Sequence, residues 1–216
     1  MNFKLNKLLL LIEFILLFFG VPLFIFFDTD IIHPSVIILP ILIAIFIYLN
    51  RVPDFRFKDL VKFNVDNKYF KKHVLFVVII SLVLLLGVYL FDRENLFNLP
   101  KGNILIWTIL CVFYPLFSAF GQEIIYRVFL YYRYRNILKN ERLYVLASAI
   151  AFSFVHIVYY SHISVILTLL LGLYLAAIYI KTKSVLFTSM IHGFLGDVIF
   201  TVGLGSYFWL DINQWI

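Results

Sequence analysis

The sequence contains few charged residues and a single cysteine. Asp, Glu, Lys and Arg together make up 14% of the 216 residues, against about 25% in soluble globular domains. So low a charge content leaves too little polar surface for a water-soluble globule. It also excludes intrinsic disorder, which needs high charge and low hydrophobicity. With only Cys111 present, an intramolecular disulfide framework and a thiolate cluster for zinc or iron–sulfur are excluded as well.

Hydrophobic residues make up 63% of the sequence and occur in long runs. A helix needs about 20 apolar residues to cross a bilayer, and no run has the period of two that is typical of a barrel strand. We therefore predict an all-α, polytopic transmembrane helical bundle. It should have about seven spans, give or take one, within Leu8–Phe27, Ile31–Leu49, Val74–Phe91, Ile104–Leu138, Leu143–Tyr160, Ile163–Ile180 and Ser184–Gly203.

Lysine and arginine are distributed unevenly between the two sides of this predicted bundle. If the N-terminus is inside, fifteen of the eighteen fall in inner segments, Arg93 and Lys101 fall outside, and Arg127 lies within a span. Because cytoplasmic loops carry an excess of Lys and Arg, we expect the N-terminus inside and the C-terminus outside. The chain is then a multi-pass protein of the cell membrane. Its net charge of +6 faces anionic lipid, and nucleic acid is not an expected partner.

Several polar side chains fall within the spans, where they are costly. A charged residue at the centre of a membrane helix costs about 2.5–3.5 kcal/mol on insertion scales, so such residues are functional hypotheses by default. Glu123 and Arg127 are four residues apart and share a helix face, and Gln122 precedes the acid. A buried salt bridge that only holds two helices together would explain this pair equally well.

Two later spans contribute two histidines and an aspartate. His156 follows Phe152 by four residues, and His192 precedes Gly196 by four. Asp197 lies about 100° further round its helix. A lone histidine in an apolar helix usually only hydrogen-bonds a neighbouring group. Together with the acid of the earlier span, however, three helices can direct one carboxylate and two imidazoles into one buried cavity.

One carboxylate and two imidazoles match the requirements of hydrolysis by an activated water molecule. The carboxylate serves as a base, a histidine helps to orient or deprotonate the water, and a donor faces the developing oxyanion. Glu123, His156 and His192 could equally bind a divalent metal. No H-E-x-x-H spacing occurs, so this signal is weak and no cofactor is expected.

Three short motifs follow one another along the chain: Gln122-Glu123-x-x-x-Arg127, Phe152-x-x-x-His156 and His192-x-x-x-Gly196. Their order resembles the CPBP family, the CAAX-protease and bacteriocin-processing intramembrane endopeptidases. The family pattern is E-E-x-x-x-R, F-x-x-x-H and H-x-x-x-N/D on separate transmembrane helices. The resemblance covers roughly residues 113–200. We therefore take residues 103–216 as the core of one continuous membrane domain, and residues 1–102 as its N-terminal helices and basic cytoplasmic loop.

The resemblance implies an endopeptidase that cleaves a peptide or protein substrate within the bilayer. Carried over to this sequence, His156 activates water, His192 donates to the oxyanion and Arg127 orients the acid pair. Phe152 and the final motif belong to the substrate-binding or oxyanion positions. Two positions depart from the family pattern: Gln122 replaces the first glutamate, and Gly196 replaces Asn or Asp, with Asp197 one residue late.

These departures leave two functions of different class open. One is a working protease for CAAX-type or bacteriocin processing, with Glu123 as base and Asp197 brought inward by helix breaks at Gly193 and Gly196. The other is a pseudo-protease that binds a peptide or membrane partner, for example in bacteriocin immunity. An introduced inactivating change at Gln122 is a third reading. A transporter or channel is less well supported, because the first three spans hold only one acid to form a pathway.

Overall fold

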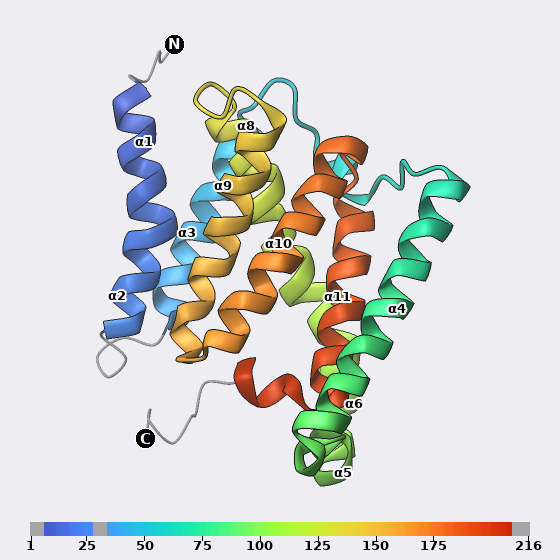
Figure 1. Cartoon of the computed structure of the whole chain (residues 1–216). Helices are drawn as coiled ribbons and strands as arrows, with labels where there is room; N and C mark the ends of the chain where they lie inside the picture. Colours follow the sequence, from blue (N-terminus) through green and yellow to red (C-terminus); the bar gives the residue numbers. More distant parts are fainter. Residues whose placement is uncertain (1–6, 28–33, 209–216) are drawn as a thin grey trace.

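Helices form all the regular structure of the described part of the chain. The computed structural model describes residues 7–27 and 34–208, and no strand occurs among them. Figure 1 shows the long helices packed side by side as one bundle. The predicted all-α, polytopic bundle is confirmed.

The elements that build the bundle follow one another with short connections. In chain order they are α1 (Lys7–Ile15), η1 (Leu16–Gly20), α2 (Val21–Phe27), α3 (Pro34–Asn50), η2 (Phe57–Val61), α4 (Asn67–Phe91), η3 (Arg93–Asn95), α5 (Asn98–Gly102), α6 (Ile104–Phe113), η4 (Tyr114–Ala119), α7 (Phe120–Glu123), η5 (Ile124–Phe129), α8 (Leu130–Tyr134), α9 (Glu141–Phe154), η6 (Val155–Tyr159), α10 (His162–Thr182), α11 (Val185–Val202) and η7 (Leu204–Phe208).

Six helical stretches among the described residues are long and apolar enough to cross a membrane. They are Lys7–Phe27, Asn67–Phe91, Ile104–Tyr134, Glu141–Tyr159, His162–Thr182 and Val185–Val202. The seventh expected span corresponds to the shorter apolar helix α3, and the first residues of its predicted range, 31–33, lie outside the described residues. The third stretch ends at Tyr134 instead of Leu138, because a turn follows it.

Polar side chains set the start of each long helix after α3. A side-chain oxygen that accepts from the backbone N–H three residues later satisfies a donor that the first helical turn leaves unpaired. The residues that cap helices in this way are Asp66, Asn103, Asn140, Ser161 and Ser184. These caps lie between the apolar runs, so they fix the register in which each span begins.

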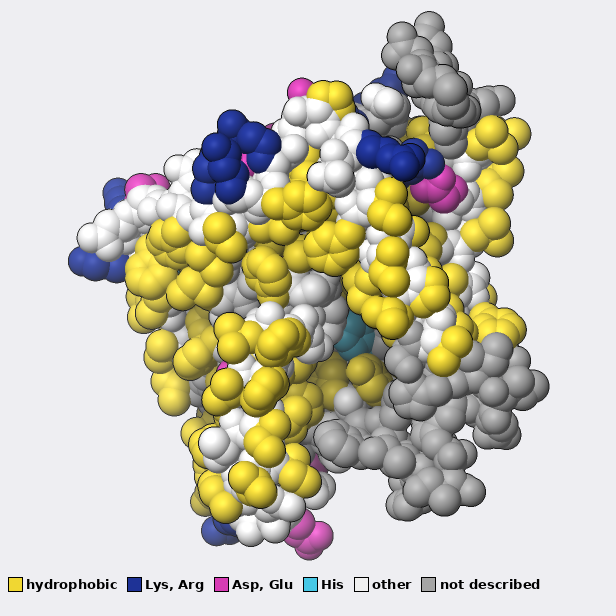
Figure 2. All heavy atoms as spheres, turned by 180° about the vertical axis from the view of Figure 1, so that it is seen from behind, with side chains coloured by type: hydrophobic (Ala, Val, Ile, Leu, Met, Phe, Trp, Pro, Cys, Tyr) yellow, Lys and Arg dark blue, Asp and Glu magenta, His cyan; other side chains and the backbone are white. Residues whose placement is uncertain are grey.

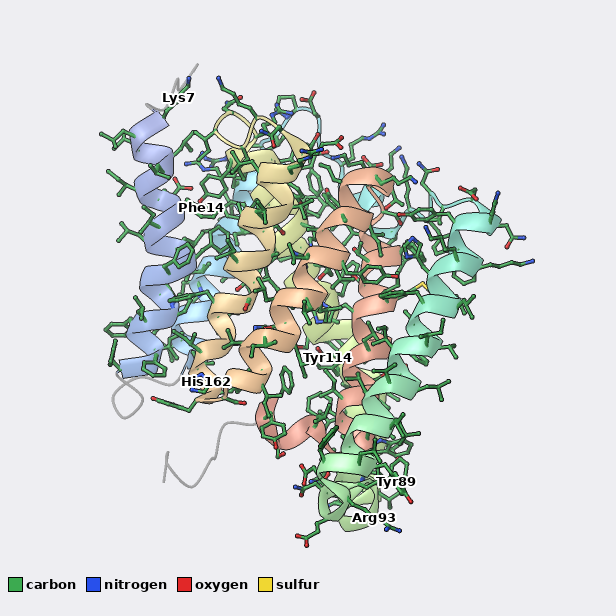
Figure 3. The ribbon with its side chains drawn as sticks, in the orientation of Figure 1. Lys7, Phe14, Tyr89, Arg93, Tyr114 and His162 are labelled. Atoms are coloured by element: carbon green, nitrogen blue, oxygen red, sulfur yellow. The ribbon has the colours of Figure 1, made fainter. Side chains whose placement is uncertain are left out.

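The basic residues gather at one end of the bundle. Lys7 lies at one end and Arg93 at the other (Figure 3). The connections before α4 and α9 and the turn before α11 lie at the Lys7 end in Figure 1. In Figure 2 most of the visible Lys and Arg side chains also lie there, above a broad hydrophobic surface. Orientation across the membrane stays a prediction, and Lys4 and the C-terminus lie outside the described residues.

Helix α1 is fixed to the long third stretch by an ion pair. Glu13 accepts from Nε of Arg133 at 2.7 Å and from the Tyr134 hydroxyl at 2.9 Å. A second nitrogen of Arg133 binds the other oxygen of Glu13. The only acid of the first three predicted spans is therefore used in helix packing, close to the basic end of the bundle.

Candidate active site

An ion pair stands at the centre of the candidate site. Nε of Arg127 donates to Oε2 of Glu123 at 3.0 Å, and both side chains are 0% exposed. The two residues lie on α7 and η5, next to each other on the long third stretch. The π-helical turns η4 and η5 flank α7 on both sides, and such turns occur frequently at functional sites.

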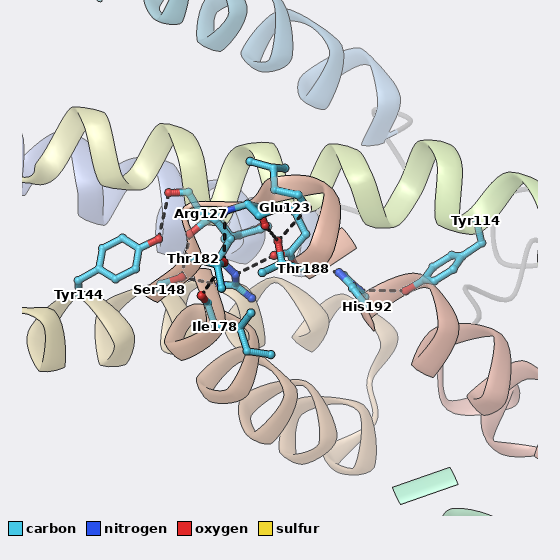
Figure 4. A network of polar contacts seen from close by, with 12 residues as sticks. Tyr114, Glu123, Arg127, Tyr144, Ser148, Ile178, Thr182, Thr188 and His192 are labelled. Atoms are coloured by element: carbon cyan, nitrogen blue, oxygen red, sulfur yellow. Dashed lines mark hydrogen bonds and ion pairs between the residues drawn. The ribbon is translucent and has the colours of Figure 1, made fainter. Parts of the chain in front are cut away.

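Arg127 also joins this stretch to α9. Its NH1 group donates to the Ser148 hydroxyl, which in turn donates to the Tyr126 carbonyl at 2.8 Å. The Tyr144 hydroxyl donates to the Arg127 carbonyl at 3.0 Å (Figure 4). The guanidinium carbon lies 5.1 Å from the ring centroid of Phe152. The arginine is therefore held on several sides, while its NH2 group is buried without a hydrogen-bond partner.

The second oxygen of Glu123 holds a histidine of α11. Oε1 of Glu123 lies 3.0 Å from Nδ1 of His192. A carboxylate paired with an arginine accepts hydrogen bonds, so Nδ1 carries the proton and the ring is fixed in one orientation. The other ring nitrogen, Nε2, lies 3.1 Å from the Tyr114 hydroxyl, and Figure 4 shows this chain of contacts.

The second histidine is fixed by the backbone of its own helix. Nδ1 of His156 lies 2.7 Å from the Phe152 carbonyl. Because a carbonyl oxygen can only accept, Nδ1 carries the proton and Nε2 keeps its lone pair. The Phe152 ring contacts both histidines, with ring centroids 5.0 Å from His156 and 5.3 Å from His192. One buried phenylalanine therefore sets the positions of both imidazoles.

Both histidines line a cavity of about 340 Å³ between α4, α10 and α11. Its polar residues are Tyr114, Ser118, Gln122, His156, Tyr159, Thr168, Tyr174 and His192. Apolar side chains of α4, α10 and α11 form much of the remaining wall. Figure 2 shows a hollow in the rear face of the molecule with a histidine side chain inside it. A few convergent polar groups in an apolar pocket are typical of a ligand site.

The structure divides the residues expected at the site into two groups. Gln122, His156, His192 and Gly196 line the cavity, whereas Glu123, Arg127, Phe152 and Asp197 are not among its lining residues. The expectation that the Glu123 carboxylate itself lines the cavity therefore differs from the structure. Its two oxygens are covered by Arg127 and His192.

Gln122 and Gly196 are the two departures from the motif pattern, and Asp197 follows the second of them. The Gln122 amide donates to the Ser118 hydroxyl at 2.9 Å, one helical turn before it, and stays partly exposed to the cavity. Helix α11 runs without a break through Gly193 and Gly196. Asp197 does not line the cavity, and its Oδ1 is buried without a hydrogen-bond partner.

A metal site at the acid and the two histidines finds no support in the side-chain geometry. Among residues 7–27 and 34–208, no three His, Cys, Asp or Glu side chains come together as a ligand set. The Glu123 oxygens, the best metal ligands of the three expected residues, already accept hydrogen bonds from the protein.

Sequence reasoning did not identify Tyr114 or Ser148 as members of this network. Both are ordinary residues of an apolar helix, and neither belongs to a motif. The two glycines of α11 could have indicated that another element packs closely here. Small residues on one face of a helix allow a neighbouring backbone or a large ring such as that of Tyr114 to approach. A Cβ atom at Gly193 would lie 2.6 Å from Cβ of Pro115, and one at Gly196 would lie 2.1 Å from Cε1 of Tyr114.

Comparison with known families adds independent support to the motif pattern. Residues 103–196 match the family model described as type II CAAX prenyl endopeptidase Rce1-like. No curated protein and no solved structure matches the chain. The matched region contains Glu123, His156 and His192 and ends at Gly196. The family is one of membrane-embedded proteases, so the match indicates a hydrolase. Residues 103–196, less than half of the 216 residues, are therefore similar to the Rce1-like endopeptidases, which agrees with the CPBP motif pattern, and the chain has six candidate membrane spans among its described residues.

Proposed function

We propose that the chain is an intramembrane endopeptidase of the cell membrane, which hydrolyses a peptide bond of a substrate bound in the 340 Å³ cavity. One observation carries the proposal: His156 and His192 line the same cavity, and each is held through Nδ1 by a protein acceptor. Each ring thus keeps Nε2 for chemistry. The Rce1-like match supports the same class of reaction.

His156 is the base in this proposal. Its Nδ1 proton is donated to a neutral carbonyl, not to a carboxylate, so the ring is in the form that accepts a proton at Nε2. Gln122 lies in the same cavity and offers an amide that orients water by hydrogen bonding but cannot take its proton. In the native chain the deprotonation step therefore falls to the imidazole.

His192 is the oxyanion donor. The Glu123 carboxylate, 3.0 Å from Nδ1, fixes the ring, and in this role Nε2 donates a hydrogen bond to the developing oxyanion. Arg127 holds the carboxylate in place from its other side. Glu123 thus acts through His192, and both of its oxygens are engaged before any water reaches it.

The reaction follows from these roles. The water oxygen attacks the carbonyl carbon as Nε2 of His156 takes one proton, and the carbonyl electron pair moves onto the oxygen that faces His192. When the tetrahedral intermediate collapses, the C–N bond breaks and His156 returns its proton to the leaving amine. The products are a carboxylic acid and an amine, and His156 regains its starting state when it gives its proton to the amine.

The cavity wall indicates the kind of substrate. Phe76, Ile80 and Val83 of α4 line one side, and α10 adds further apolar residues. A peptide with apolar groups next to the scissile bond fits such a wall because it buries hydrophobic surface there. CAAX-type substrates and bacteriocin leader peptides are the two substrate classes that we consider under this proposal.

The test measures cleavage of a fluorogenic apolar peptide by the purified full chain in lipid vesicles. We expect the native chain to cleave and His156→Gln to lower kcat by about 10²–10⁴-fold, the usual contribution of general-base catalysis. His73→Gln is the matched control, because His73 and His156 are both 7% exposed and His73 lies outside the cavity lining. A native chain that binds the peptide but never cleaves it would be a pseudo-protease, and equal rates in native and His156→Gln would refute the assigned base.

A further inference from the structure

Tyr114 occupies the space that a side chain at position 196 would fill. A Cβ atom built on Gly196 would lie 2.1 Å from Cε1 of Tyr114, 2.7 Å from Cζ and 2.8 Å from the hydroxyl oxygen. Side-chain Cβ atoms do not approach other atoms this closely. Any larger residue at position 196, including the Asn or Asp of the family pattern, is therefore incompatible with the position of this tyrosine.

The Tyr114 hydroxyl lies beside the proposed oxyanion donor. Its oxygen is 3.1 Å from Nε2 of His192, and both residues line the cavity. Figure 3 places Tyr114 between the two ends of the bundle that Lys7 and Arg93 mark. A tyrosine hydroxyl carries one O–H donor, so it can supply the oxyanion with one hydrogen bond, as one N–H of an asparagine amide would.

Close packing holds Tyr114 in this position. The next residue, Pro115, lies directly against Gly193, where a Cβ atom would come within 2.6 Å of the proline. The ring of Phe200 packs edge-on against the tyrosine, with the centroids 5.4 Å apart. Donors that are fixed before the reaction stabilise a developing charge without reorganisation.

We propose that the Tyr114 hydroxyl is a second oxyanion donor, which replaces the side chain that Gly196 lacks. The glycine leaves the space free and the tyrosine fills it with a donor, so Tyr114 compensates for the side chain that is missing at position 196. Two donors, Nε2 of His192 and the hydroxyl of Tyr114, then face the same oxygen of the substrate. This inference rests on the proposed endopeptidase function.

The first test compares Tyr114→Phe with the native chain in the peptide cleavage assay. Loss of one oxyanion-hole donor costs about 10²–10³-fold in kcat, so we expect a decrease in this range with KM unchanged, since the ring still packs in place. Tyr126→Phe is the control: it removes a hydroxyl from a buried tyrosine of the same stretch that does not line the cavity. Equal thermal midpoints for the native chain and both variants show that the fold is kept.

The second test exchanges the two positions. Gly196→Asn alone should abolish cleavage, because the new side chain collides with the tyrosine ring. The double variant Tyr114→Ala/Gly196→Asn should cleave at least ten times faster than Tyr114→Ala, because the amide enters the vacated space. A double variant no faster than Tyr114→Ala would contradict the exchange of roles.

The outcomes separate this inference from the function on which it rests. If the native chain cleaves and Tyr114→Phe has native kcat, or changes KM alone, the oxyanion role is refuted and the endopeptidase stands. If neither the native chain nor Gln122→Glu cleaves any apolar peptide, the proposed function fails and the inference fails with it. A selective loss of kcat in Tyr114→Phe supports both.

Discussion

Two adjacent residues of the first motif have opposite surroundings. Gln122 faces the cavity, whereas Glu123 is 0% exposed and bonds Arg127 and His192. Neighbours on an α-helix point about 100° apart, so sequence spacing predicts that the two differ in direction. Spacing cannot tell which one faces the cavity, because that depends on where α11 brings His192. The motif residues could therefore be named from the sequence, but the division of their roles and the involvement of Tyr114 and Ser148 could not.

The ion pair between Glu123 and Arg127 leads us to predict a loss of stability when one partner is replaced. Glu123→Gln leaves Arg127 buried without its counter-charge, and removal of one partner from a buried pair costs about 3–5 kcal/mol. We expect a marked decrease in the thermal midpoint in detergent and loss of cleavage. The double variant Glu123→Gln/Arg127→Met should recover most of the stability but no activity, because His192 still lacks its acceptor. An unchanged thermal midpoint in Glu123→Gln would show that the ion pair does not stabilise the fold.

At the scale of helices, the spans were readable but their local irregularities were not. Apolar runs and capping residues such as Asn103 and Ser184 locate the helices closely. The π-helical turns η4 and η5 have no comparable signature, because they depend on how the long stretch packs against α11. Their effect is functional, since η4 begins at Tyr114 and η5 carries Arg127.

The contact between α11 and η4 predicts different effects for two glycine variants. Gly193→Ala places a Cβ atom 2.6 Å from Cβ of Pro115, so α11 and η4 must move apart. We expect a loss of about 1–3 kcal/mol in stability and a lower kcat, because His192 and Tyr114 separate. Gly87→Ala meets nothing within 4 Å and is the control, with native activity. Native kcat and stability in Gly193→Ala would show that this close contact is not needed.

At the scale of the whole molecule, composition and charge predicted most of the architecture. In a bilayer the backbone N–H and C=O groups must form their hydrogen bonds within the protein, as they do in a helix. Long apolar runs therefore leave few alternatives to a helical bundle. The number of spans was less certain because α3 is shorter than the others. The site could not be placed in three dimensions from the sequence, since the cavity arises where α4, α10 and α11 meet.

The distribution of basic residues predicts the orientation of the whole bundle. Lys58 belongs to the connection before α4, which lies at the end that we assign to the cytoplasm (Figure 1), and Arg93 lies at the opposite end (Figure 3). In a Cys111→Ser background, a membrane-impermeant thiol reagent added outside should label Arg93→Cys but not Lys58→Cys. The reverse labelling pattern would invert the topology.

The most direct measurement of the central claim is the kcat of the native chain beside that of Gln122→Glu. Residue 122 lines the same cavity as both histidines, so a carboxylate there adds a base at the proposed site of the attacking water. We predict measurable cleavage by the native chain and a rate at least tenfold higher in Gln122→Glu, with His156 required in both. Absence of cleavage in both proteins, despite native folding and peptide binding, would contradict the proposed function.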